Sequence, residues 1–252
     1  MKEWQRYTCD KSDAQATFSY RPEDAAVFIA FRGTDSFRDF LIDACVVKRE
    51  APFLEDNCND ARVHGGFLEQ YLSCRDDAAG YVDRFPNRKN VVVTGHSLGG
   101  ALATLFAAYL RDRNPDENVT CITFGCPRVG NRAFSQHLDR VLTVKRIVVG
   151  NDPVTTIPTR FRWKHAGTRA LFVNGEKASR SGSGDPWINA LLLPNLLRLS
   201  DHDMSGYIDA VTADEDDELG TEDYKRVSRV KSWVSKALLA IAGAVVWGMW
   251  HR

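Results

Sequence analysis

The stretch Val91–Ala101 (VVVTGHSLGGA) decides the fold. Its first four residues, Val91–Thr94, have the composition of a buried β-strand, and a helical pattern follows Ser97. A serine with glycines two positions before and two positions after it, at a strand-to-helix turn, is the nucleophile elbow G-x-S-x-G. The glycines remove the Cβ atoms that would collide in so sharp a turn. The pattern therefore predicts that the hydroxyl of Ser97 stands clear at the edge of a sheet.

Strand-like and helical segments alternate on both sides of this elbow. Apolar, β-branched runs typical of strands buried on both faces are Val91–Thr94, Val119–Phe124 and Val144–Val149. Helical stretches are Gly66–Phe85, Leu98–Arg113 and Asn131–Val141. Near the start of the chain, Thr17–Tyr20, a turn at Pro22–Asp24 and Ala25–Arg32 predict a hairpin. The alternation predicts an α/β fold with right-handed crossovers and a mostly parallel sheet.

A serine hydroxyl is a weak nucleophile until a base takes its proton, so the chain must supply a histidine and an acid. In this class of fold they follow the serine in the order Asp or Glu, then His. Asp152 follows the buried run Val144–Val149, at the carboxyl end of a strand, where the active sites of open α/β sheets lie. His165 and His202 are the remaining histidine candidates. His202 is favoured because Arg169–Val173 can form one more strand before it, which leaves His165 a structural role.

Placed together, Ser97, Asp152 and His202 make the chain resemble the class 3 (fungal-type) lipase family of α/β-hydrolases. Five ordered segments over about residues 25–210 carry the resemblance: Phe31–Thr34 (FRGT), Val63–Leu68 (VHGGFL), Gly95–Leu105 (GHSLGGALATL), Phe124–Asn131 (FGCPRVGN) and Asn151–Val154 (NDPV). The resemblance implies an α/β-hydrolase-like fold, with a mostly parallel central sheet and helices on both faces.

The resemblance also implies roles that spacing alone does not. Thr34 and Leu98 would supply the backbone N–H donors of an oxyanion hole, with Ser97, Asp152 and His202 as the catalytic triad of an acyl transfer. No metal and no organic cofactor is needed. The implied reaction is hydrolysis of acylglycerol or phospholipid esters.

Two further segments bear on the substrate. Asp35–Asp43 (DSFRDFLID) falls where the family places its lid, and Phe37, Phe40 and Leu41 share one face at helical spacing. It is either a movable lid or a short helix packed on the core. Arg160, Arg162, Lys164 and Arg169 follow Asp152 and form either a site for an anionic headgroup or a solvated face.

Overall composition excludes several classes of function. Among 252 residues, 33 Lys and Arg balance 33 Asp and Glu, so the chain lacks the basic surface expected of a nucleic-acid partner. None of the six cysteines forms a C-x-x-C pair, which argues against a zinc ribbon or a thioredoxin motif. The first residues contain no apolar segment of a secretory signal. We therefore expect an intracellular protein with reduced thiols.

The chain changes character after residue 211, which predicts three regions: a catalytic domain over residues 1–211, a linker over 212–232 and an apolar tail over 233–252. The linker is first acidic (Asp214–Glu218) and then basic, and Ala237–Trp250 carries no charge. Tryptophans and flanking bases are typical of a membrane interface. The tail is thus a candidate membrane anchor, or alternatively a helix packed on the domain.

Fold and triad do not determine the substrate, so two other functions stay open. A small-ester esterase or thioesterase would use the same three residues. A catalytically silent membrane-interaction module is the third possibility, and the complete set of Ser97, Asp152 and His202 argues against it.

Overall fold

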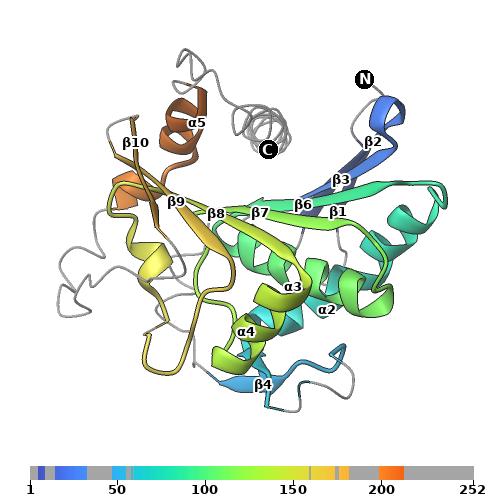
Figure 1. Cartoon of the computed structure of the whole chain (residues 1–252), viewed down its shortest axis with the longest axis horizontal. Helices are drawn as coiled ribbons and strands as arrows, with labels where there is room; N and C mark the ends of the chain where they lie inside the picture. Colours follow the sequence, from blue (N-terminus) through green and yellow to red (C-terminus); the bar gives the residue numbers. More distant parts are fainter. Residues whose placement is uncertain are drawn as a thin grey trace.

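The computed structural model describes residues 5–8, 15–32, 47–54, 58, 60–158, 160–173, 176–181 and 199–212. Eight strands of this part form one sheet in the order β1-β2-β3-β6-β7-β8-β9-β10 (Figure 1). Their bounds are β1 Gln5–Thr8, β2 Gln15–Arg21, β3 Ala26–Phe31, β6 Asn90–His96, β7 Val119–Phe124, β8 Thr143–Val149, β9 Thr168–Val173 and β10 Glu176–Ser181.

The centre of the sheet is parallel and its two edges are antiparallel. Strands β3, β6, β7, β8 and β9 pair in parallel, whereas β1-β2-β3 and β9-β10 are antiparallel. Every residue of β3 is buried, as are five of the seven residues of β6, because helices cover the sheet on both sides. The predicted mostly parallel sheet of an α/β-hydrolase-like fold is confirmed.

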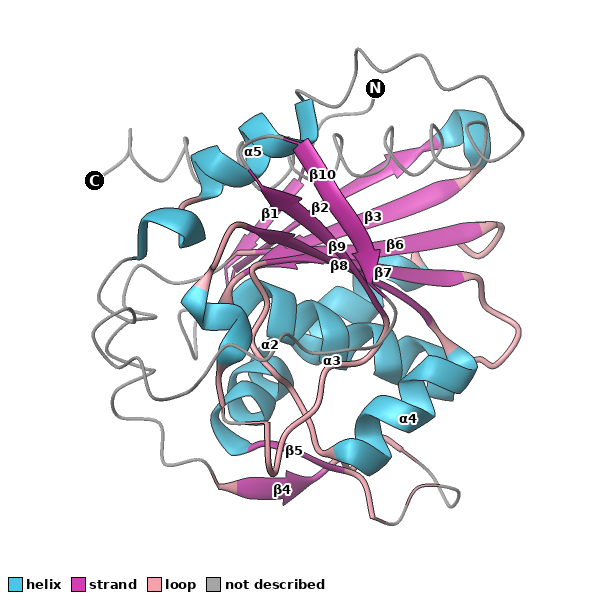
Figure 2. Ribbon diagram, turned by 60° about the vertical axis from the view of Figure 1, so that its left-hand side comes forward, coloured by secondary structure: helices cyan, strands magenta, loops and turns pink. Residues whose placement is uncertain are grey.

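Helices lie on both faces of the sheet, as expected (Figures 1 and 2). On one face pack α2 (Gly65–Asp83), α3 (Leu98–Arg113) and α4 (Arg132–Val141). On the other face α5 (Met204–Thr212) inserts Tyr207 among Phe28, Val92 and Phe124. The hydrophobic core is therefore divided by the sheet, with its larger part under α2 and α3.

The element bounds agree closely with the sequence pattern where the apolar signal is strong. The hairpin is formed by β2 and β3 around the 3-10 turn η1 (Pro22–Asp24), and β7 and α3 have the predicted limits. The pattern did not predict β1, β10 or the small two-stranded sheet of β4 (Lys48–Glu50) and β5 (Arg62–His64). These strands are short or polar, so they lack a period-2 apolar signal.

Several predicted features lie outside the described residues: Thr34, the lid segment 35–43, most of the linker and the whole tail. Within the part of the chain that the structure describes, no helix combines the length and apolar character needed to cross a membrane. The described cysteines, Cys58, Cys74, Cys121 and Cys126, are all free thiols.

Candidate active site

Ser97 occupies the sharp turn between β6 and α3. Its backbone has φ +57° and ψ −127°, a conformation that side chains of L-residues rarely adopt. Strain of this kind persists only where the surroundings impose it, and it is concentrated at functional sites. The side chain of Ser97 therefore projects from the carboxyl end of β6, although the residue as a whole is buried.

The glycines around Ser97 are required by close backbone approach. A Cβ on Gly95 would lie 2.2 Å from the carbonyl group of Gly99. A Cβ on Gly99 would lie 2.2 Å from the carbonyl oxygen of Phe31, at the end of β3. Neither distance can be accommodated, because both neighbours are backbone atoms. The elbow thus depends on glycine at both positions, as its sequence pattern predicts.

Asp152 follows β8 through a tight turn in which Gly150 has φ +51°. The carboxylate is buried, and its Oδ1 accepts a hydrogen bond of 2.9 Å from the N–H of Val154 in the 3-10 turn η2 (Pro153–Thr156). One oxygen is thus held by the backbone, and the other, Oδ2, faces the carboxyl ends of β7 and β8.

His202 brings these two distant residues together. It ends the 3-10 turn η4 (Leu199–His202), after the last strand of the sheet. Its Nδ1 lies 2.8 Å from Oδ2 of Asp152, and its Nε2 lies 2.8 Å from Oγ of Ser97. With the Nδ1 proton donated to the carboxylate, Nε2 is left as the acceptor for the proton of the serine hydroxyl. The three residues form a hydrogen-bonded chain suited to activate Ser97.

The other histidine candidate does not reach this chain. Nε2 of His165 lies 2.8 Å from the carbonyl oxygen of Thr155. This contact ties the segment after η2 back to η2 itself. The structural role expected for His165 agrees with this position.

Tyr207 is a member of the site that the sequence did not reveal. Its hydroxyl donates a hydrogen bond of 2.5 Å to Oδ2 of Asp152, the same oxygen that faces His202. Burial raises the pKa of the phenol well above its usual value, so it remains a proton donor. In the sequence, Tyr207 occupies one apolar position of the short helix after His202. No local pattern indicates that its hydroxyl donates to the catalytic acid.

Gly125 and Asp201 shape the same region. A Cβ on Gly125, whose φ is +55°, would lie 2.7 Å from Oδ2 of Asp152 and 3.0 Å from the ring of His202. The carboxylate of Asp201 accepts a hydrogen bond of 2.9 Å from the N–H of Asn151. Gly125 therefore leaves room for the triad, and Asp201 joins the turn of His202 to the turn of Asp152. The sequence signal that could have identified Gly125 as part of the site is its position directly after the buried strand β7.

A second imidazole lies against His202. The ring of His96 stacks on it at 4.5 Å between centroids and meets Tyr207 edge-on at 5.4 Å. Burial, with the neighbouring His202 as a smaller cause, lowers the pKa of His96 to about 3. His96 is consequently neutral, and it adds no positive charge beside the histidine that must take a proton.

Of the two candidate oxyanion donors, Leu98 lies among the described residues and Thr34 does not. Leu98 is the first residue of α3, so its N–H lies at the positive end of the helix dipole, directly after Ser97. Thr34 lies outside the described residues. Strand β3, which leads to it, runs beside the elbow, since Phe31 pairs with Gly95 in parallel register. Among the described residues, no group of three or more His, Cys, Asp or Glu side chains is arranged to hold a metal ion.

Comparison with known proteins agrees with this geometry. The family model described as Lipase (class 3) matches residues 28–162. A lipase of Rhizopus niveus is 32% identical over 178 residues, which cover 67% of this chain and 44% of the relative. A secreted mono- and diacylglycerol lipase of Gibberella zeae is 30% identical over 175 residues, covering 57% of this chain and 43% of the relative.

Solved structures show the same fold. A triacylglycerol lipase whose catalytic centre is described as a serine protease triad superposes with a TM-score of 0.66 at 26% identity, covering 79% of this chain and 77% of that one. The chain spans less than half the length of the curated relatives above.

The expectation of an intracellular protein is wrong, because relatives of this chain are named as secreted lipases. That expectation rested on the first few residues alone, and the matched relatives extend well beyond this chain. The candidate anchor over residues 233–252 lies outside the described residues and gains no support from these comparisons.

Proposed function

The chain belongs to the class 3 lipase family, and from that premise we propose that it is a serine carboxylic-ester hydrolase acting on lipid esters. The observation that carries the proposal is the continuous chain of contacts from Tyr207 through Asp152 and His202 to Ser97, with 2.8 Å on each side of the imidazole. A serine and a histidine this close, with the histidine oriented by a buried acid, form the arrangement needed for nucleophilic acyl transfer.

In the proposed reaction, Oγ of Ser97 bonds to the ester carbonyl carbon while Nε2 of His202 takes the hydroxyl proton. The carbonyl oxygen becomes an oxyanion, which the N–H groups of Leu98 and Thr34 would stabilise. The carbon–oxygen bond to the alcohol then breaks, and His202 returns the proton to the leaving oxygen. Water, deprotonated by the same histidine, releases the acid and restores Ser97. Asp152 holds the imidazole and stabilises its charged form throughout.

For the substrate we propose acylglycerol esters ahead of phospholipid esters, since one relative is named as a mono- and diacylglycerol lipase. We assign the reaction to a catalytic domain of residues 1–211, a boundary that lies one residue before the end of α5. A small-ester esterase or thioesterase with the same triad is the competing function. It differs in preferring short, soluble acyl chains.

Hydrolysis of a panel of lipids by the wild type and Ser97→Ala tests the proposal. The panel contains mono-, di- and triacylglycerols, phospholipids, short soluble esters and thioesters. We expect glycerol esters to be cleaved fastest and Ser97→Ala to reduce the rate by about 10⁴-fold or more. Ser73→Ala is the matched control, because its hydroxyl bonds the carbonyl of Gln70 within α2. A Ser97→Ala protein that keeps the activity would refute the assignment, and fastest cleavage of short thioesters would favour the competing function.

A further inference from the structure

The most exposed large hydrophobic side chain of the described residues is Phe161, which is not part of the triad. Phe161, in the segment between η2 and β9, is 87% exposed, compared with 47% for Val47 and 38% for Leu72. Single exposed apolar residues are common on soluble proteins. The surroundings of Phe161 are what set it apart.

Basic residues flank this phenylalanine in the sequence. Arg160 and Arg162 are its sequence neighbours, and Lys164 follows. Lys48 on β4 lies near this segment, since its Nζ is 5.5 Å from the ring centroid of Trp163 and the charge of Arg162 acts on it. We call Phe161 and these four bases the basic–aromatic patch. Within the described part of the chain, no carboxylate forms an ion pair with Lys48, Arg162 or Lys164.

The patch is held rigidly. Trp163 is almost fully buried and contacts the ring of His64 at 5.5 Å between centroids. The guanidinium of the buried Arg128 donates 2.8 Å to the carbonyl oxygen of Pro158, just before the patch. Lys164 bridges to Gly130, which in turn bridges to Val63 on β5. Phe161 thus directly precedes residues that are anchored to the domain at Trp163 and Lys164, so little conformational entropy is lost when it binds.

Charge accumulates on the patch. Burial lowers the pKa of Lys48, and the positive charge of Arg162 lowers it further. Cations that repel each other are stabilised by an external anion, and several such cations together favour a surface with many negative charges.

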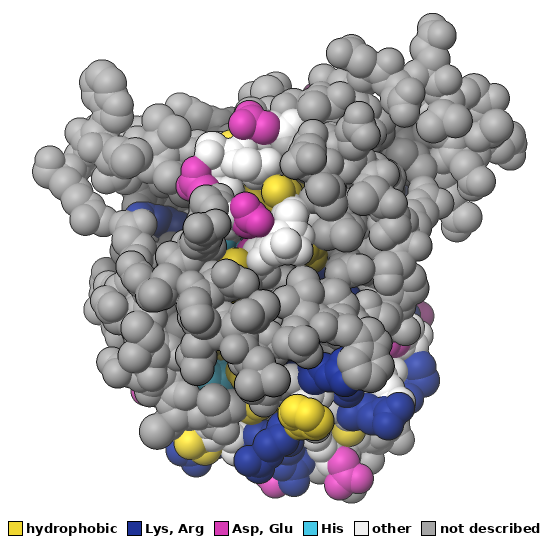
Figure 3. All heavy atoms as spheres, turned by 90° about the vertical axis from the view of Figure 1, so that its left-hand side faces the viewer, with side chains coloured by type: hydrophobic (Ala, Val, Ile, Leu, Met, Phe, Trp, Pro, Cys, Tyr) yellow, Lys and Arg dark blue, Asp and Glu magenta, His cyan; other side chains and the backbone are white. Residues whose placement is uncertain are grey.

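The segment of the patch follows the acid of the candidate active site along the chain. Figure 3 shows the side of the molecule that carries α5 in Figure 1, and dark blue Lys and Arg side chains gather with exposed yellow hydrophobic ones at the lower end of that face. In sequence, Asp152 is followed by η2 and then by the patch. The patch therefore belongs to the segment that leaves the carboxyl edge of the sheet after Asp152.

We propose that the basic–aromatic patch docks the protein on an anionic lipid surface, with Phe161 inserted among the acyl chains and the four bases against the headgroups. This inference rests on the proposed function, because it concerns how the same site meets an aggregated lipid ester. An exposed aromatic side chain between basic residues suits the boundary between headgroups and acyl chains. The chain as a whole carries no net charge, which argues against a polyanion such as nucleic acid as the partner.

Sedimentation with lipid vesicles tests the docking separately from catalysis. Full-length protein carrying Ser97→Ala is mixed with vesicles of phosphatidylcholine, alone or with phosphatidylglycerol, at low and high salt. The Arg160→Gln/Arg162→Gln pair removes two charges from the patch. Its control, Arg84→Gln/Lys89→Gln, removes two exposed charges near the start of β6, at the opposite end of the sheet. Phe161→Ala is matched by Leu72→Ala on α2.

We expect tighter binding to the anionic vesicles, weakened by salt. Arg160→Gln/Arg162→Gln should lower that binding about 25-fold, at about fivefold for each basic residue, and so reduce the preference for phosphatidylglycerol. Phe161→Ala should lower binding to both kinds of vesicle by about tenfold. Equal binding by the two charge variants would overturn the proposal, as would equal wild-type binding to the two vesicle compositions, which would point instead to an acidic protein partner.

With Ser97 restored, the patch variants should hydrolyse a soluble monomeric ester at the wild-type rate. This measurement separates the two proposals. Loss of vesicle binding with retained ester hydrolysis supports the docking surface. A wild type that binds vesicles but cleaves no ester leaves the patch in place and refutes the proposed function.

Discussion

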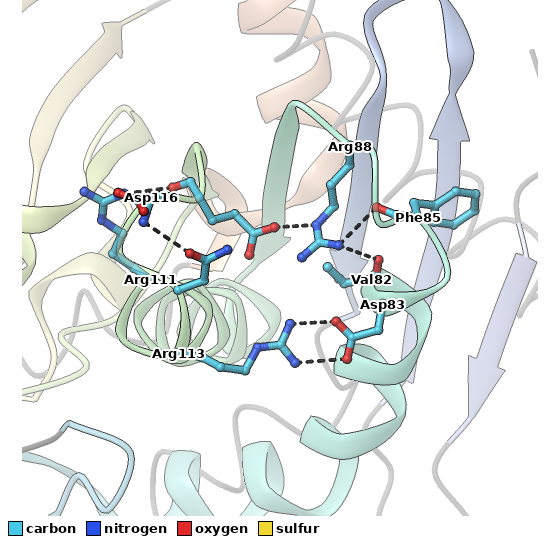
Figure 4. A network of polar contacts seen from close by, with 9 residues as sticks. Val82, Asp83, Phe85, Arg88, Arg111, Arg113 and Asp116 are labelled. Carbon is cyan, nitrogen blue, oxygen red and sulfur yellow. Dashed lines mark hydrogen bonds and ion pairs between the residues drawn. The ribbon is translucent and has the colours of Figure 1, made fainter.

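The two ends of the parallel strands use buried polar groups in opposite ways. At the amino ends, Arg88 pairs with Glu117 and also donates to the carbonyl oxygens of Val82 and Phe85, at 3.1 and 3.0 Å (Figure 4). These contacts join the turn before β6 to the turn before β7. At the carboxyl ends, the chain of contacts from Tyr207 ends on the hydroxyl of Ser97. The first network is closed on itself, and the second ends on an atom that can react.

The two networks therefore have different roles: the groups at the amino ends stabilise the fold, and those at the carboxyl ends support catalysis. In Figure 4 the guanidinium groups of Arg88 and Arg113 are paired with carboxylates of neighbouring turns and helices. Substituting either arginine should therefore leave the geometry of the triad unchanged. At the other end, Asp152 and Tyr207 act on a substrate only through His202. Perturbing the amino end should therefore change the free energy of unfolding, and perturbing the carboxyl end should change the rate.

Asp152→Asn is the largest expected effect. The amide cannot stabilise a charged imidazole, and it can donate to Nδ1 and so stabilise the wrong tautomer of His202. We expect kcat for a lipid ester to fall about 10⁴-fold with little change in KM. Asp139→Asn is the control, since Asp139 accepts a hydrogen bond from the N–H of Gly167, away from the triad. Retention of more than a tenth of the activity by Asp152→Asn would contradict the role of this acid.

Arg88→Gln tests the closed network. The side chains of Arg88 and Glu117 are only 11% and 6% exposed, so the substitution leaves a buried carboxylate without its partner. We expect the free energy of unfolding to fall by about 3 kcal/mol. Arg113→Gln removes an exposed pair with Asp83 in the same network and should cost less than about 1 kcal/mol. Urea unfolding measures both, and kcat of each folded variant should equal that of the wild type.

Stability should fall in mild acid because desolvation keeps two histidines, His64 and His96, neutral in the folded chain. Burial lowers the pKa of His64 to about 4 and that of His96 to about 3, compared with about 6.5 in the unfolded chain. Between pH 6.5 and pH 4 the unfolded chain therefore binds more protons than the folded one. The free energy of unfolding should decrease as pH falls, by up to about 1.4 kcal/mol per pH unit for each histidine.

Unfolding curves of the wild type and His64→Gln across this pH range check the sign and the share of one histidine. The substitution should make the slope shallower, since glutamine does not titrate. A slope that is unchanged in His64→Gln would show that other groups cause the loss of stability.

Tyr207→Phe is the smallest expected effect at the reactive end. The ring remains packed against His96, and Asp152 keeps its contacts with His202 and the N–H of Val154. Losing one hydrogen bond to a charged group should lower kcat about tenfold with KM unchanged. Tyr109→Phe on α3, whose ring lies 5.6 Å from the guanidinium of Arg113 at the closed end, should leave kcat unchanged. A rise in KM with kcat unchanged would show that Tyr207 acts on substrate binding instead.

The sequence was sufficient to predict features that depend on backbone conformation or burial within one segment. The elbow at Ser97 was predictable because only glycine permits the approaches at Gly95 and Gly99, so the residue types record the geometry. The buried strands were predictable because a strand covered on both faces must be apolar throughout. His202 was preferred over His165 from chain order and the predicted strand Arg169–Val173, and the structure brings His202, and not His165, to Ser97.

Tertiary structure alone decided which groups meet across long separations. Tyr207 donates to a carboxylate 55 residues earlier in the chain, and nothing near it in sequence records that contact. Lys48 reaches Trp163 through pairing of short strands that carry too little apolar pattern to be predicted. Local sequence specifies backbone conformation and burial, which are properties of one segment. The polar partners of a buried or surface group depend on how segments pack, so they become visible only in the folded chain.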